Sequence, residues 1–231
     1  MIQIEICVEQ ATDSRLAAEA GADRIELCRE LWCGGLTPTD EDLRVALEGA
    51  PAGGIRILVR ERPEGFALTT DEVDGLVERI EHLRHLSETA EVPVGFVVGS
   101  ITAEEGGEID LEAARRFRVA AGDRPLVFHR AFDEVADQHR ALDQLIELGY
   151  TGVLTTGGHQ VADPESLRAL VEQADGRIAI IASGGVRAHN VVEILQQTGA
   201  PEVHMRAPLP DSTKSDPQLM QEIVGRVRAE L

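Results

Sequence analysis

The chain has 231 residues and a formal net charge of −19, with 22 basic residues against 41 acidic ones. This acidity argues against nucleic acid or an anionic membrane as a main partner. No segment has the length of a membrane span or the features of a secretory leader, so we expect a cytoplasmic protein. Lys214 is the only lysine. Strong acidity with so little lysine favours a halophilic source, whose salt would screen the self-repulsion; an arginine-rich GC-rich genome is the alternative.

Short apolar runs alternate with helical stretches along the whole chain, which predicts repeated strand–helix units. The predicted strands are Ile2–Cys7, Arg24–Cys28, Ile55–Val59, Val94–Val98, Leu126–His129, Gly152–Thr155, Ile178–Ala182 and Glu202–His204. The predicted helices are Ala11–Ala20, Asp40–Leu47, Thr70–Ser87, Asp110–Ala120, Ala136–Leu148, Pro164–Gln173, Ala188–Gln197 and Asp216–Ala229. Eight such pairs predict an α/β fold, a single-domain (β/α)8 TIM barrel over residues 1–231. An open doubly wound sheet is the alternative, but no phosphate-binding glycines follow the first strand.

Charged residues fall on the inward-facing side of several predicted strands. Successive strand side chains alternate between the two faces, so in a barrel one set points inside. That set includes Glu5, Glu26 and Arg60. Buried charges are costly unless they pair or bind something. They therefore predict an internal salt-bridge network, a functional site, or both together.

Carboxylates and imidazoles gather at the predicted strand ends. Glu5 and Glu26 lie near the ends of strands one and two, His129 and Asp133 around the end of strand five, and His204 at the end of strand eight. The first and last strands of a closed barrel are neighbours, so Glu5, Glu26 and His204 should cluster. Such groups can act as general acid and base, or ligate a metal. For each histidine, the alternative is a hydrogen-bonded polar residue of the barrel mouth.

Arginines and glycines follow other strands. Arg60 and Arg62 come after strand three and Arg130 after strand five; guanidinium groups suit carboxylate or phosphate, although pairing with nearby acids is the alternative. Polar and glycine residues follow strands six and seven, where backbone N–H groups can approach an anion, although tight turns also use glycine. These further anion-binding candidates are Thr156, Gly157, Gly158, Ser183, Gly184 and Gly185.

The three cysteines do not suggest a disulfide framework, because their number is odd and an intracellular chain keeps its thiols reduced. They are Cys7, Cys28 and Cys33. The spacing of Cys28 and Cys33 is not a standard zinc spacing. Cu(I) can be held by two thiolates, so this pair stays open as a copper site.

Several stretches of the chain resemble the CutC family of copper homeostasis proteins. The longest are the run GADRIELC ending at Cys28 and the run FHRAFD ending at Asp133. Shorter matches are Glu5–Cys7, Gly34–Pro38, Arg60–Arg62, Leu154–Gly157, Gly184–Asn190 and Glu202–His204. The resemblance implies a TIM barrel, a cytoplasmic homodimer, and Cu(I) binding by cysteines, with Cys28 and Cys7 at the matching positions.

The chain departs from the family pattern around the mouth, at Glu61, Leu68, Met205 and Arg206, so its ligand can differ from that of other members. Two main functions follow. One is a cytoplasmic Cu(I)-binding protein of copper homeostasis. The other is an enzyme that acts on a small anionic metabolite, phosphorylated or sugar-like, by acid/base chemistry at the carboxyl-terminal mouth of the barrel. A scaffold dimer is the third alternative.

Overall fold

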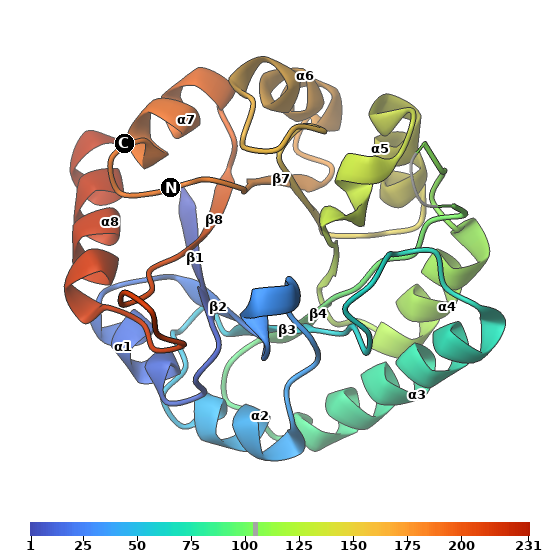
Figure 1. Ribbon diagram of the computed structural model, residues 1–231, viewed down its shortest axis with the longest axis horizontal. Helices are drawn as coiled ribbons and strands as arrows, with labels where there is room; N and C mark the ends of the chain where they lie inside the picture. The colour runs from blue at the N-terminus through green and yellow to red at the C-terminus, as the bar shows by residue number, and fades with distance from the viewer. Residues whose placement is uncertain (104–105) are drawn as a thin grey trace.

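A computed structural model describes residues 1–103 and 106–231. Within them, parallel strands form a closed eight-stranded barrel that helices surround (Figure 1). The strand order follows the chain, and the last strand pairs with the first. The strands are β1 (Gln3–Val8), β2 (Arg24–Leu27), β3 (Ile55–Leu58), β4 (Val94–Val97), β5 (Leu126–Phe128), β6 (Gly152–Thr155), β7 (Ala179–Ala182) and β8 (Glu202–Arg206). The predicted TIM barrel is confirmed.

The helices alternate with these strands along the chain. They are α1 (Asp13–Glu19), α2 (Asp40–Leu47), α3 (Thr70–Leu86), α4 (Leu111–Ala121), α5 (Gln138–Glu147), α6 (Pro164–Ala174), α7 (Val191–Thr198) and α8 (Pro217–Glu230), with short 3-10 helices η1 (Leu31–Cys33) and η2 (Arg130–Glu134). In Figure 1, η1 is the short blue helix over the centre of the ring of strands. It belongs to the loop after β2, which therefore reaches over the barrel.

Two differences from the predicted boundaries concern the carboxyl-terminal part of the chain: the end of β8 and the start of α7. Strand β8 continues to Arg206, beyond its predicted end at His204, because β1 continues alongside it and Cys7 pairs with Arg206. Helix α7 begins at Val191 rather than Ala188. The side chain of Asn190 accepts a hydrogen bond from the Arg187 N–H at 2.7 Å, which holds this segment in a turn before the helix.

Strand side chains divide between two apolar layers. Ile4, Ile6 and Val8 of β1 are fully buried in the large core between the strands and the helices. The opposite faces of the strands fill the inside of the barrel with a second cluster: Cys7, Cys28, Leu58, Val97, Val127, Leu154 and Ile181. Alternation along each strand produces both layers. Two of the three cysteines consequently lie inside the barrel.

Several helices begin at a side chain that satisfies their free N–H groups. Thr39 and Thr69 form capping boxes with Asp42 and Glu72 at the starts of α2 and α3. Aspartates serve the same purpose at the starts of α4, α5, α6 and α8. These caps fix where six of the loops over the mouth return to a helix. No helix among the described residues is long and apolar enough to cross a membrane.

Candidate functional site

A network of four charges, two of them buried and two partly buried, closes the inside of the barrel between β1, β2, β3 and β8. Arg24 Nε lies 2.6 Å from Glu5 Oε2, and Arg24 Nη2 lies 2.6 Å from Glu202 Oε2. Arg56 Nη1 bridges the same two oxygens, at 3.2 Å and 2.9 Å. Burial opposes ionisation of Glu5, but Arg56 and Arg24 outweigh it and hold the pKa of this carboxyl well below its usual range. Glu5 is therefore an ionised structural anion rather than a proton donor.

His204 connects this network to Glu26 and Cys7. Its Nδ1 lies 2.8 Å from Glu5 Oε1 and 3.9 Å from Glu26 Oε2. Burial opposes protonation of the imidazole. However, the attraction of Glu26 and hydrogen bonds with Cys7 and Glu5 raise the pKa of His204 well above its ordinary value. The predicted cluster of Glu5, Glu26 and His204 thus forms, with His204 as the cation.

Glu26 is the carboxyl group of this cluster that is held least closely, since its ion-pair contact with His204 Nδ1 is 3.9 Å long. Its Oε2 is buried and accepts no hydrogen bond within the described part of the chain. Desolvation raises the pKa of Glu26 to about 7, against the opposing attraction of His204. Near neutral pH this side chain can therefore both donate and accept a proton, as an acid/base group or a hydrogen-bond donor to a ligand.

Two thiols adjoin the same cluster. Cys7 Sγ lies 3.5 Å from Cys28 Sγ, and both side chains are buried. Cys7, Glu26 and His204 also present ligand atoms that all lie within 4.8 Å of one another. The hydrogen bond with Cys28, together with burial, raises the pKa of Cys7 well above its ordinary value. The donor set fits a soft cation that can displace thiol protons, and sulfur ligands favour Cu(I) among such ions.

Cys33 forms a different contact from the one that its spacing to Cys28 suggested. It lies on η1, and its Sγ donates to the carbonyl of Glu30 at 3.0 Å. The thiol adjacent to Cys28 is Cys7, which comes from the neighbouring strand. A copper site of two thiols therefore depends on the pairing of β1 and β2 rather than on a local sequence motif.

His129 stands at the mouth as a neutral imidazole. Its Nδ1 accepts a hydrogen bond from the Ala131 N–H at 3.2 Å, which places the ring proton on Nε2. Burial, with Arg60 nearby, lowers the pKa of His129 to about 3. The ring packs against Phe66, with centroids 4.9 Å apart. His129 can donate one hydrogen bond through Nε2 but does not carry a charge at neutral pH.

The two arginines after β3 have separate positions. Arg60 lines the mouth and donates from Nη1 to the carbonyls of Cys33 and Gly35, at 3.1 and 3.2 Å, and it stacks over Phe66. It therefore holds the η1 loop over the barrel. Strand β3 ends at Leu58, so Arg60 has left the barrel wall and does not join the buried charge network.

Arg62 turns away from the mouth. Its Nε lies 2.7 Å from Glu72 on α3, and its Nη2 donates to the Ala67 carbonyl at 2.7 Å. It lines a side cavity of about 340 Å³ between the loop after β3 and α3, whereas the described residues around the mouth do not include it. The expected pair of anion-binding arginines is thus divided between two places.

Asp133 organises the loop after β6. Its Oδ1 accepts hydrogen bonds from the Thr155 hydroxyl and from the N–H groups of Thr156 and Gly158, and its Oδ2 lies 3.0 Å from Arg130 Nε. The Gly157 N–H donates to the Thr155 hydroxyl at 2.9 Å. The Asp133 carboxylate therefore accepts the hydrogen bonds that a bound anion would otherwise receive from this loop.

The mouth itself is a cavity of about 660 Å³. Eleven of the candidate residues line it: Cys7, Glu26, Arg60, His129, Arg130, Asp133, Gly158, Ser183, Gly184, Gly185 and His204. Glu5, Cys28, Arg62, Thr156 and Gly157 lie behind or beside this lining. Sequence reasoning did not assign roles to Arg24, Arg56 and Glu202, although strand alternation puts the first two on the inward face.

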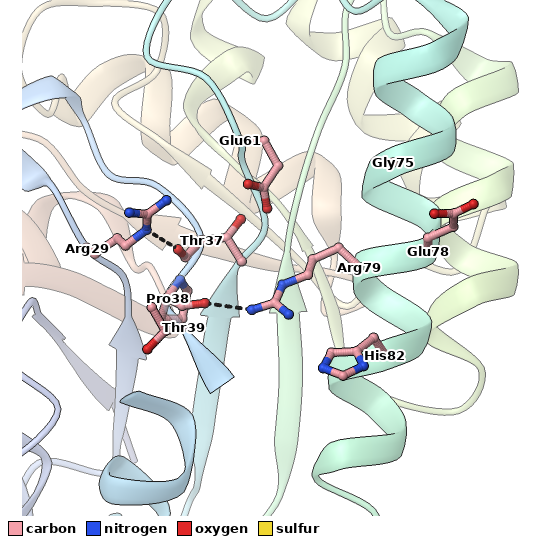
Figure 2. Close-up of a pocket in the computed structure, with 9 residues that line it drawn as sticks. All are labelled: Arg29, Thr37, Pro38, Thr39, Glu61, Gly75, Glu78, Arg79 and His82. Carbon is pink, nitrogen blue, oxygen red and sulfur yellow. Dashed lines mark hydrogen bonds between the residues drawn. The ribbon is translucent and has the colours of Figure 1, made fainter. Parts of the chain in front are cut away.

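A third cavity, of about 500 Å³, lies outside the barrel between the start of α2 and α3 (Figure 2). Arg79 Nη2 donates to the Pro38 carbonyl at 2.8 Å, and Arg29 Nε donates to the Thr37 carbonyl at 2.6 Å. The Asp40 carboxylate lies 2.7 Å from Arg79 Nη1 and 2.7 Å from His82 Nε2. These bonds connect α3 to the loop before α2. The polar side chains of this groove therefore have a structural role, and they do not require a ligand to account for them.

Comparison with known proteins gives consistent results. The model of the CutC family matches residues 2–208. A family protein CutC from Bacteroides thetaiotaomicron is 36% identical over 226 residues, covering 96% of this chain and 87% of the relative. One from Histophilus somni is 35% identical over 210 residues, covering 89% of this chain and 82% of the relative.

Solved structures agree with this result. A CutC protein from Streptococcus agalactiae, provisionally described as a copper homeostasis protein, superposes with a TM-score of 0.78 at 33% identity, over 88% of this chain and 98% of its own. An N-(5'-phosphoribosyl)anthranilate isomerase from Pyrococcus furiosus superposes with a TM-score of 0.61 at 13% identity, over 99% of this chain and 100% of its own. The second likeness shows the shared barrel fold alone.

Proposed function

Since the chain belongs to the CutC family, we propose that it binds Cu(I) in the cytoplasm as part of copper homeostasis. Cys7 and Cys28 are the ligands. The observation that carries this proposal is the 3.5 Å separation of their two Sγ atoms inside the barrel. Thiolate sulfur is the donor that favours Cu(I) over harder ions. The description of the Streptococcus agalactiae relative supports the same role.

The charges around the thiols suit such a site. Binding of one Cu(I) with release of two thiol protons adds one net negative charge. Arg24 and Arg56 already balance Glu5 and Glu202. The protonated His204, which hydrogen-bonds to Cys7, remains to offset the added charge. Cytoplasmic residence is part of the proposal, because a reducing compartment keeps both thiols and Cu(I) in the required state.

The test is an anaerobic competition titration with a chromogenic Cu(I) chelator. We expect the wild type to bind one Cu(I) per chain and Cys28→Ser to lose most of that affinity. Cys33→Ser is the matched control, because the Cys33 thiol donates to a backbone carbonyl on η1 and should be dispensable. Equal affinity in Cys28→Ser and the wild type, or loss in Cys33→Ser alone, would contradict the assignment.

A further inference from the structure

The mouth cavity is much larger than a single metal ion needs. Its volume of about 660 Å³ falls in the range of organic ligand sites, roughly 300–1,000 Å³. The chain as a whole carries a net charge of −19, yet arginines outnumber acidic residues around this cavity: Arg60, Arg130, Arg187 and Arg206 against Glu26, Asp133 and Glu134. Local positive charge in an acidic protein favours an anionic ligand.

The loop after β7 presents backbone donors that the protein leaves unused. Among the described residues, the N–H groups of Gly184, Gly185 and Val186 have no protein acceptor. All three residues line the cavity. The loop after β6 differs, because Asp133 and Thr155 occupy the N–H groups of Thr156, Gly157 and Gly158. Successive free N–H groups form a concave binding site for an oxyanion.

Arg206 lies on the strand next to this loop. It is an inward-facing residue of β8, because it pairs in register with Cys7, and it lines the cavity half-buried. Its guanidinium makes no hydrogen bond or ion pair with any described residue. Arg130, by contrast, pairs with Asp133 at 3.0 Å. Arg206 is therefore an available cation beside available N–H groups.

Two buried side chains elsewhere on the cavity wall each keep one polar atom without a hydrogen bond. Glu26 is 5% exposed, and its Oε2 accepts no hydrogen bond in the described structure. His129 is likewise 5% exposed; its Nδ1 is occupied, and its Nε2 makes no hydrogen bond with another described residue. A buried polar atom without a partner, such as Glu26 Oε2, is costly. A polar ligand in the cavity would satisfy both.

We propose that the mouth of the barrel binds a small organic phosphate monoester. The phosphate group lies against the N–H groups of Gly184, Gly185 and Val186 and pairs with Arg206. The hydroxylated body of the ligand extends to Glu26 and His129. The loops after strands seven and eight are where barrels of this fold commonly hold phosphate. This site does not depend on copper, since neither Arg206 nor the loop after β7 belongs to the thiol pair.

The experiment is isothermal titration of the full chain with ribose 5-phosphate, with ribose as the matched ligand that lacks the phosphate, in phosphate-free buffer containing KCl. We expect ribose 5-phosphate to bind at one per chain, ribose to bind much more weakly, and inorganic phosphate to compete. Arg206→Gln should lower the affinity for ribose 5-phosphate at least about tenfold, since a charge-assisted hydrogen bond is lost. Arg206→Lys should keep part of the affinity.

Arg115→Gln is the control for net charge, because Arg115 lies on α4, away from the mouth, and its guanidinium hydrogen-bonds only to the Leu111 carbonyl among described residues. It should bind like the wild type. Thermal melts of every variant show whether the fold is kept; Arg206 has no internal partner, so its replacement should be tolerated. No binding of ribose 5-phosphate or inorganic phosphate to the wild type, or equal binding by folded Arg206→Gln, would overturn the proposal. Cys28→Ser should leave phosphate binding intact, which separates this site from the copper site.

Discussion

Replacement of Glu26 by glutamine should stabilise the protein, and more so as the pH rises. Desolvation raises the pKa of Glu26 to about 7 from an ordinary value of 4.5. Between these two pH values the folded state keeps a proton that the unfolded chain has released. Stability therefore falls with rising pH, by about 1.4 kcal/mol per unit. The full penalty, reached above pH 7, is roughly 3 kcal/mol. Glutamine keeps the shape of the protonated acid and avoids this penalty.

The assay is urea unfolding of the wild type and Glu26→Gln at pH 5 and pH 8. The free energy of unfolding of the variant, minus that of the wild type, should be about 2–3 kcal/mol larger at pH 8 than at pH 5. Taking this difference cancels groups that titrate equally in both proteins. A difference that stays constant with pH, or that shrinks as the pH rises, would refute the environment that we assign to Glu26.

Other predictions concern the charges and thiols of the barrel. Arg56→Met leaves Glu5 and Glu202 with incomplete pairing, so it should lower the free energy of unfolding by about 3–5 kcal/mol; exposed Arg44→Met should cost under about 1 kcal/mol. A similar loss in both variants would contradict the network. The Cu(I) affinity should rise with pH, because the pKa of the Cys7 thiol is raised and Cu(I) must displace its proton; the expected slope is up to about tenfold per unit for each thiol, and chelator competition at several pH values measures it. A flat profile would argue against thiolate ligation. The melting temperature should rise from low to molar KCl, because salt screens the −19 charge; a melt that salt leaves unchanged would remove the halophilic interpretation.

Strand alternation in the sequence was enough to predict the barrel and part of its interior. It placed Glu5 and Glu26 inside, and closure of the barrel brought them to His204. The pairing partners were harder to predict. Arg60 was expected inside, but β3 ends two residues earlier, and Arg24 and Arg56 form the network instead. Strand ends depend on the packing of the loops, which residue patterns do not specify.

The pairing of the thiols was likewise not predictable from local sequence. Local spacing drew attention to Cys28 and Cys33, whereas the structure places Cys28 beside Cys7, 21 positions away in the sequence. This contact depends on the register between β1 and β2, and neither strand specifies that register alone. The loops after β6 and β7 also look alike as sequences. Only the position of Asp133 shows that one is already occupied and the other is free.

X-ray absorption at the copper edge, on anaerobically loaded protein, tests the central claim most directly. Ligation by Cys7 and Cys28 predicts two sulfur neighbours for Cu(I), with one sulfur lost in Cys7→Ser and in Cys28→Ser and neither lost in Cys33→Ser. A shell of nitrogen and oxygen alone, or two sulfurs that persist in Cys7→Ser, would contradict it.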